Sequence, residues 1–339
     1  MRFPLASTAL AALSCSLSAQ ALNILLNNDD GWASANIRET YRLLKEAGHN
    51  VLMVAPVVDN SGQGGRAVFS TSPTLLTPGE FSSVPAGAPA LGSDPSDSHM
   101  WYYNGTPAAC TFVALDHVLP RVWPNVTAPD LLVAGPNVGQ NLGSFLYTLS
   151  GTMGATYAAV GRGVPAIAVS ASSVGGQRSW EWLNQTTESG WPDPATLHAR
   201  LTVSVNFPTI TSLTNDSCVD PPFVLTRLSG GGALSDIAVY NESTQLFRYG
   251  DIAGPGLDVC INGDCSLPGE TEVVESGCRS AVSVFTVDYD APVGKNATSV
   301  RHKLAPLVQD GAAFVGKRGV DASAGSKRAG QRPYPWRHE

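Results

Sequence analysis

Residues 22–31 read LNILLNNDDG, and this stretch decides the fold. Its apolar run, Ile24–Leu26, is typical of a buried strand, and the polar segment that ends in Gly31 is typical of a turn into a helix. Apolar side chains then recur at helical spacing up to Gly48, which suits a helix C-terminus: Ile37, Tyr41, Leu44 and Ala47. Residues 51–56 are apolar again. A strand, a helix and a strand within 35 residues predict a right-handed parallel unit.

The same alternation continues to about residue 210. We expect strands near 67–71, 101–103, 130–135 and 164–170, and a surface loop over the Pro- and Gly-rich residues 77–98. Thr106 and Pro107 have the residue types that open a helix, and a helix of small residues is expected from Ser150 to about Gly161. Alternating strands and helices predict an α/β, doubly wound fold with a mainly parallel sheet.

The chain divides into four predicted segments. Residues 1–21 carry Arg2, an apolar run and an Ala-x-Ala end, which together indicate a secretory signal peptide. Residues 22–210 form the α/β domain, and residues 211–316 form a smaller β-rich extension between Gly-rich turns. Residues 317–339 are polar and basic, and we expect a disordered tail there.

Composition excludes several classes of protein. The 339 residues are 43% hydrophobic, which is enough for a sizeable core, and only 14% are charged. The formal net charge of −7 argues against binding to a nucleic-acid duplex, whose phosphates require a basic surface. After the signal, no run reaches the ~18 apolar residues of a membrane helix, so we expect no membrane anchor.

Cysteines and sequons fit an oxidising, extracellular compartment. Four cysteines cluster late in the chain, and their short spacing favours the pairs Cys260–Cys265 and Cys218–Cys278 among three possible pairings. Cys110 is expected to be a buried free thiol. Asn-x-Ser/Thr sequons predict a secreted glycoprotein with five candidate sites: Asn125, Asn184, Asn215, Asn241 and Asn296. A further sequon at Asn104 lies inside a motif described below.

Polar side chains follow three of the predicted strands. Asp29 and Asp30 come after the first, Asn60 and Ser61 after the second, and Asn137 with Asn141 after the strand at 130–135. Ligands of open parallel sheets bind at the carboxyl ends of strands. Carboxylate, hydroxyl and amide oxygens suit Mg²⁺, Mn²⁺ or Ca²⁺ better than zinc. Each of these stretches alone is more often a simple turn, so only their joint placement favours a metal.

Ser150-Gly151-Thr152 opens the predicted helix of small residues. Unpaired N–H groups and the positive end of a helix dipole make such a start a candidate anion site. A hard cation beside an anion site points to phosphate-ester chemistry, because the cation would bind and polarise the phosphate.

These motifs resemble the SurE (survival protein E) family of metal-dependent phosphatases and 5′(3′)-nucleotidases, and the signal peptide and sequons resemble its secreted fungal branch. Five segments carry the resemblance, in the family's order, together with the strand at 163–170: Asn28–Gly31, Val54–Gly62, Asn104–Cys110, Gly135–Gly143 and Ser150–Thr152. The chain departs from the family at Asn27, where Thr or Ser is usual, and at Ala109, where Asp is usual.

The resemblance implies a Rossmann-like fold and a set of site residues. The divalent metal would be Mg²⁺ or Mn²⁺, with Ca²⁺ a further option, and its ligands would be Asp29, Asp30, Ser61 and Asn137. Either Asp29 or Asp30 would activate the attacking water. The phosphate side would be formed by Asn141, Ser150, Gly151 and Thr152. The family uses the region beyond residue 210 for dimer arms, so a homodimer is one expected assembly.

The predicted function is therefore a secreted, metal-dependent phosphomonoesterase of acid phosphatase or nucleotidase type, acting on small phosphomonoesters that include nucleoside monophosphates. A nucleotidase with a narrow base preference is an alternative among enzymes. An alternative of another class is a catalytically silent nucleotide- or glycan-binding surface glycoprotein with the same fold.

Overall fold

The computed structural model describes residues 21–171, 177–181, 202–209, 218, 220–230, 235–252, 263–286, 289–291 and 293–309. Within them, the first half of the chain contains β1 (Asn23–Asn27), α1 (Ala35–Glu46), β2 (Asn50–Pro56), η1 (Glu80–Ser82), β3 (Leu91–Asp94), β4 (Asp97–Tyr103), α2 (Pro107–Val113), η2 (Ala114–Val118), α3 (Leu119–Val122), β5 (Leu131–Val138), α4 (Gly143–Leu149), α5 (Gly151–Gly161) and β6 (Ala166–Ala171). The second half contributes β7 (Thr202–Phe207), β8 (Phe223–Thr226), β9 (Ser235–Asn241), β10 (Leu246–Ile252), α6 (Glu270–Glu275), β11 (Ser280–Thr286), β12 (Tyr289–Asp290) and α7 (Lys295–Leu304).

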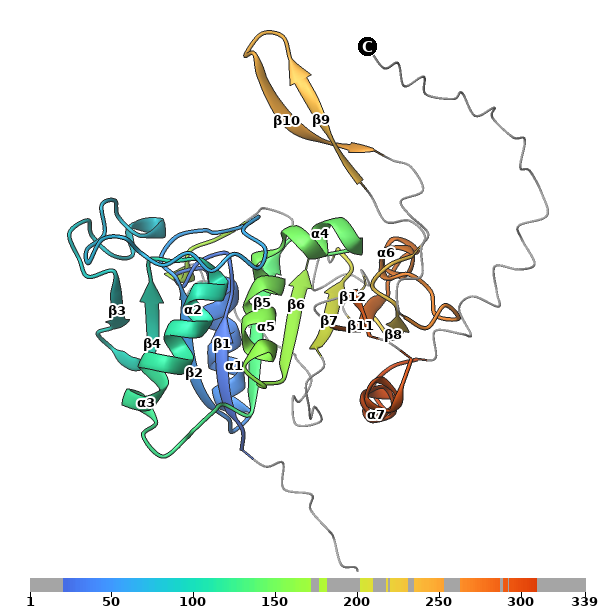
Figure 1. Ribbon diagram of the computed structural model, residues 1–339, viewed down its shortest axis with the longest axis horizontal. Coiled ribbons are helices and arrows are strands. Elements are labelled where there is room, and N and C mark those ends of the chain that lie inside the picture. Colours follow the sequence, from blue (N-terminus) through green and yellow to red (C-terminus); the bar gives the residue numbers. More distant parts are fainter. Residues whose placement is uncertain are drawn as a thin grey trace, which may run out of the picture.

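One ten-stranded sheet organises these elements (Figure 1). Its order is β12-β11-β7-β6-β5-β1-β2-β4-β3, with β8 pairing beside β11. The pairs from β4 through β2, β1, β5 and β6 to β7 are all parallel, whereas β3 and β12 add antiparallel edges. The predicted α/β, mainly parallel sheet is thus confirmed. Strand β1 has β2 on one side and β5 on the other, which places the topological switch point of the sheet between β1 and β5.

Helices cover both faces of the sheet because side chains of β1 alternate between them. Ile24 and Leu26 pack in the cluster that holds Ile37 and Tyr41 of α1. Leu25 packs in the opposite cluster, with residues of α2 and α5. Every one of these β1 side chains is fully buried, as the apolar run at 24–26 predicted.

Two local predictions were wrong. No strand forms at 67–71, because that segment runs as an irregular chain held by Thr106: its hydroxyl receives the Val68 N–H at 2.9 Å and donates to the Arg66 carbonyl at 2.6 Å. Residues 77–98 are not all loop. They include η1 and β3, and they lead into β4, which forms an antiparallel pair with β3. A short edge strand with a bulge carries little apolar signal, so composition alone indicated a loop.

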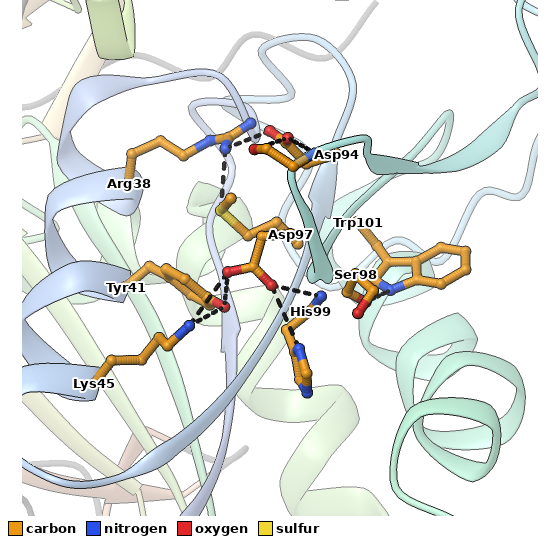
Figure 2. Close-up of polar contacts among 10 residues, drawn as sticks. Arg38, Tyr41, Lys45, Asp94, Asp97, Ser98, His99 and Trp101 are labelled. Atoms are coloured by element: carbon orange, nitrogen blue, oxygen red, sulfur yellow. Dashed lines mark hydrogen bonds and ion pairs between the residues drawn. The ribbon is translucent and has the colours of Figure 1, made fainter.

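The β3–β4 hairpin is fastened to α1 by a network of polar contacts, shown in Figure 2. Arg38 donates to Asp94 at 2.8 Å, and its guanidinium lies over the Trp32 ring at 4.5 Å. Asp97 receives the Tyr41 hydroxyl at 2.7 Å and the Lys45 ammonium at 3.2 Å. These contacts hold the edge of the sheet against the helix that follows β1.

The C-terminal region shares the main sheet through β8, β11 and β12, whereas β9 and β10 form a separate two-stranded antiparallel sheet (Figure 1). A disulfide joins Cys218 to Cys278 across 60 residues. Cys265 is also disulfide-bonded, but Cys260 lies outside the described residues, so the Cys260–Cys265 pair stays a prediction. Cys110 is a buried free cysteine, as expected.

Several other predictions fall on residues that are not described. They are residues 1–20 of the signal peptide, the tail at 317–339, the sequons at Asn184 and Asn215, and the side chain of the sequon residue Asn296. Asn125 and Asn241 are exposed, which leaves both accessible for a glycan. None of the helices in the described part of the chain is long and apolar enough to span a membrane.

Candidate functional site

Asp29 and Asp30 follow directly after β1, at the edge of the sheet where β1 and β5 meet. Both carboxylates are almost fully buried, at 2% and 3% exposure. The backbone there is held from the neighbouring loop, since the Asn60 N–H donates to the Asp29 carbonyl at 2.7 Å. Two adjacent acids at a switch point have the placement of a ligand site in open α/β sheets.

Asp29 is held by the start of α5. The Thr152 hydroxyl donates to its Oδ1 at 2.5 Å, and the Thr152 N–H also donates to the carboxylate. Gly151 is required at this contact, because a Cβ at that position would lie 2.9 Å from the Asp29 Cβ and 3.1 Å from Oδ2. Ser150 caps the helix by accepting the Met153 N–H at 3.2 Å. The structure thus brings Gly151 and Thr152 to Asp29, and Ser150 caps the same helix.

Asp30 is held by β5. Its Oδ2 accepts the Val138 N–H at 2.9 Å, and Val138 follows the predicted ligand Asn137. The Asn137 amide nitrogen donates to the Gly139 carbonyl at 2.8 Å, which leaves its Oδ1 as the atom that can accept or ligate. Asn137 is 7% exposed. Asp30 is therefore bonded to β5 at the residue directly after Asn137, where two neighbouring strands end.

Ser61 has a different environment from the other predicted ligands. It is exposed, and its hydroxyl and N–H both donate to Asp59 Oδ1, at 2.7 and 2.8 Å. In such an Asx-turn, the Asp side chain accepts hydrogen bonds from the residue two positions later. The loop after β2 is thus close to Asp29 through Asn60, while the Ser61 side chain is engaged by Asp59.

Asn141 belongs to a loop tied to the second half of the sheet. Its side-chain nitrogen donates to Ser170 Oγ at 2.7 Å, and its N–H donates to Asn206 Oδ1 at 2.9 Å. Two residues later, the Gly143 N–H donates to Glu270 Oε1 at 2.9 Å. Glu270 is fully buried and also receives the Ser283 hydroxyl at 3.0 Å. These bonds fix the loop that carries Asn141 directly after β5.

Burial dominates the electrostatics of the two aspartates. Desolvation and the neighbouring Asp29 charge raise the pKa of Asp30 to about 8. Burial also raises the pKa of Asp29, against the opposing effect of its hydrogen bonds from Thr152. The charge of Glu80 also raises the pKa of Asp30. The pKa of Glu80 is itself raised to about 7 by burial and by the charge of Asp59. The site concentrates acidic groups whose charged forms burial disfavours and a bound cation would stabilise.

Three acidic residues around the site were missed from the sequence. Asp59 stands next to the Asn60-Ser61 stretch, so its residue type and position were a signal that could have been used. Glu80 lies in η1, and its backbone N–H donates to the Val57 carbonyl at 3.0 Å, in the segment that follows β2. Glu270 is 127 residues from Gly143, and no local pattern indicates that contact.

The donor set fits a hard divalent cation. Two buried carboxylates and the Asn137 amide oxygen are oxygen ligands of the kind that Mg²⁺, Mn²⁺ and Ca²⁺ accept. No group of three or more His, Cys, Asp or Glu gathers to hold a metal among the described residues. Asp29, Asp30 and Asn137 instead form a mixed carboxylate and amide set.

Comparison with known proteins identifies the family. The family described as "Survival protein SurE" matches residues 24–229, which is more than half of the chain. The chain is also 43% identical over 288 residues to a protein named acid phosphatase from Yarrowia lipolytica, a match that covers 79% of this chain and 80% of that protein. The chain belongs to the SurE family.

Two further SurE proteins show how far the likeness extends. A protein named 5′-nucleotidase SurE from Desulfovibrio desulfuricans is 36% identical over 153 residues, which is 45% of this chain and 51% of that relative's length. The crystal structure of the SurE protein from Aquifex aeolicus matches with a TM-score of 0.50 and 22% identity, covering 78% of this chain and 94% of that chain. The second comparison shows the shared fold.

The SurE segments of this chain gather at one edge of the sheet. Four of them lie at the ends of β1, β2, β4 and β5, which run parallel, so their carboxyl ends share that edge. The fifth, Ser150–Thr152, reaches the edge through the bond from Thr152 to Asp29. The departure at Asn27 has a structural use, because its side-chain nitrogen donates to the Pro107 carbonyl at 2.8 Å and to Thr111 at 3.0 Å. Ala109 is fully buried in α2.

Proposed function

We propose that this protein is a secreted, metal-dependent phosphomonoesterase that hydrolyses small phosphate monoesters, including nucleoside monophosphates. The single observation that carries the proposal is the pair of buried carboxylates, Asp29 and Asp30, held at the switch point by α5 and β5. Membership of the SurE family and the names of its relatives, acid phosphatase and 5′-nucleotidase, support this class of reaction.

In this proposal, Asp29, Asp30 and Asn137 hold the cation, and Ser61 joins them if its hydroxyl turns away from Asp59. When bound, the cation supplies the positive charge that draws electron density from the phosphoryl group. Thr152 holds the Asp29 carboxylate in place through its two hydrogen bonds. Either Asp29 or Asp30 also orients the attacking water and takes its proton.

The phosphate is expected beside the start of α5. Ser150 and Gly151 lie at its first turn, where backbone N–H groups and the helix dipole favour an anion. Asn141 is hydrogen-bonded to Ser170 and Asn206. We propose that its side-chain amide also donates a hydrogen bond to a phosphate oxygen. As the water oxygen bonds to phosphorus and the P–O bond to the leaving group breaks, the leaving oxygen departs with the bonding electron pair and takes a proton from solvent. The positive end of α5 stabilises the charge that develops on the phosphoryl oxygens.

Secretion is proposed from the pattern of residues 1–21 and from the Cys218–Cys278 disulfide, since disulfides persist in oxidising compartments. Expression in a eukaryotic secretory host should release the protein into the medium, with its N-terminus near residue 22. Protein retained inside the cell with residues 1–21 attached would contradict this part of the proposal.

The substrate class is tested by comparing adenosine monophosphate with p-nitrophenyl phosphate, using the purified protein with added Mn²⁺ or Mg²⁺. Similar kcat/KM values for the two esters support a broad phosphomonoesterase. Hydrolysis of the nucleotide alone would favour a nucleotidase with a narrow base preference. Hydrolysis of neither by a folded protein would contradict the proposed function.

A further inference from the structure

A cavity of about 340 Å³ lies beside the candidate site, between the loop after β2 and the segment that joins β4 to α2. Its wall is well ordered by hydrogen bonds. The Ser70 N–H donates to the Tyr103 hydroxyl at 3.0 Å, and the Asn104 amide donates to Ser70 Oγ at 3.1 Å. Gly105 permits the close approach, because a Cβ there would lie 2.9 Å from the Val68 carbonyl oxygen.

The cavity presents apolar side chains to solvent. Val68 and Phe69 are 44% and 48% exposed, and Leu76 is 82% exposed. Phe69 also lines a second cavity of about 320 Å³, whose wall includes Leu91 and Phe112. Exposed apolar side chains that gather on one short segment are typical of a binding surface. Phe69 therefore lines both cavities.

The cavity adjoins the loop that contacts Asp29, because both include Asn60. This residue lines the cavity, and its N–H donates to the carbonyl of Asp29 at 2.7 Å. Thr106 lines the cavity as well, and the next residue, Pro107, lies 3.0 Å from where a Cβ on Gly151 would stand. Gly151 itself packs on Asp29. The cavity wall therefore includes residues that adjoin the surroundings of Asp29, which makes the cavity a candidate for the organic part of a substrate whose phosphate lies there.

The polar part of the lining narrows the choice of occupant. Arg66 donates to the Gln63 side chain at 3.0 Å, and both line the same cavity as Phe69. A guanidinium and an amide beside an aromatic ring suit a flat group that carries oxygen or nitrogen atoms. A short aliphatic chain would leave the Phe69 ring uncovered.

We propose that this cavity binds an aromatic leaving group of the phosphomonoester, with Phe69 as the residue that determines specificity for it. This inference rests on the proposed function. Phe69 stacks on the ring of an aryl ester or a nucleobase, while Gln63 and Arg66 hydrogen-bond to its polar atoms. Aliphatic phosphate esters gain nothing from Phe69, so the residue sets a preference among substrates.

The test compares 1-naphthyl phosphate with glycerol 2-phosphate in the full-length protein with added Mn²⁺. The measured quantity is the kcat/KM for 1-naphthyl phosphate divided by the kcat/KM for glycerol 2-phosphate. Because the two leaving groups differ in acidity, only the change of this ratio between variants is informative. Phe69→Ala is expected to lower the ratio about tenfold, chiefly through the KM for the naphthyl ester, which is the size typical of base–aromatic stacking.

Two matched variants complete the test. Phe69→Trp keeps a stacking surface and is expected to retain the wild-type ratio or exceed it. Tyr240→Ala removes an aromatic side chain of similar exposure, 46%, on β9, and should leave the ratio at the wild-type value. An unchanged ratio in Phe69→Ala, or an equal change in Tyr240→Ala, overturns the inference. A wild-type protein that hydrolyses neither ester overturns the proposed function and this inference together.

Discussion

The hydroxyl of Thr152 lies 2.5 Å from Asp29 Oδ1 and donates to it, which joins two residues 123 positions apart. The contact places the start of α5 against the end of β1. It gives the buried carboxylate a fixed direction and stabilises its charged form against the effect of burial. The contact therefore fixes the end of β1, which carries Asp29, against the helix start that is expected to face the phosphate.

Removing this hydroxyl should weaken metal-dependent activity. Thr152→Val keeps the shape of the side chain but leaves Asp29 without its side-chain donor, so the carboxylate holds a cation less well. We expect kcat/KM to fall about 10- to 100-fold, with a higher Mn²⁺ concentration needed for half-maximal activity. Thr152→Ser keeps the donor and should stay within a few-fold of wild type. A Val variant as active as the Ser variant would contradict this role.

Asp29→Asn should abolish most activity without unfolding the protein. The amide oxygen of the variant side chain would still accept the hydrogen bond from the Thr152 hydroxyl, but it could not supply the negative charge that a cation needs. We expect kcat/KM to fall at least about 100-fold, while the Tm stays equal or rises, since an unfavourable buried charge is removed. Asp130→Asn, which removes an exposed acid that accepts from the Asn23 N–H at 2.8 Å, is the control and should retain activity.

Glu270 should make folding stability depend on pH. Burial raises its pKa to about 8 from the ordinary 4.5. Below pH 4.5 the carboxyl is protonated in both states, so its contribution is constant. Between pH 4.5 and 8 only the unfolded chain loses the proton, so the unfolding free energy falls as pH rises, by up to ~1.4 kcal/mol per pH unit.

Glu270→Gln tests that dependence. The variant keeps an acceptor for the Gly143 N–H and has no proton to lose, so urea unfolding at pH 5 and pH 8 should show a flatter pH dependence than wild type. Glu275→Gln, an exposed change on the same helix α6, should keep the wild-type dependence. Identical pH dependence in all three proteins would show that Glu270 is ionised in the folded state.

The Cys218–Cys278 disulfide should contribute substantially to stability. It closes a loop of 60 residues, for which chain entropy predicts a loss of about 4 kcal/mol when both cysteines are replaced by Ser. Non-reducing peptide mapping should recover Cys218 joined to Cys278 and Cys110 as a free thiol. The same map tests the predicted Cys260–Cys265 pair. A peptide that links Cys110 to any later cysteine would contradict this assignment.

Much of the sheet was predictable because its signals are local. The apolar run at 24–26, the helical spacing up to Gly48 and the small-residue helix after Ser150 all formed where expected. The switch point between β1 and β5 follows from these elements and fixes where ligands bind in such sheets. The positions of Asp29, Asp30 and Asn137 at strand ends could therefore be read from residue type and order.

What was missed depends on tertiary contacts. The segment at 67–71 has strand-like residues, but it is bound to Thr106 rather than to a sheet. The bond between Glu270 and Gly143 joins regions 127 residues apart, and no periodicity encodes it. Ser61 illustrates a limit of matching by motif, because the neighbouring Asp59 engages its hydroxyl in the structure.

The most direct test of a metallophosphatase centred on Asp29 and Asp30 is metal-dependent hydrolysis by the wild-type protein. The purified protein is stripped with a chelator and assayed with p-nitrophenyl phosphate from acid to neutral pH, with and without added Mg²⁺, Mn²⁺ or Ca²⁺. We predict no turnover after stripping and its return with at least one of these cations. Full activity in the chelator, or no activity with any cation from a folded protein, would contradict the account.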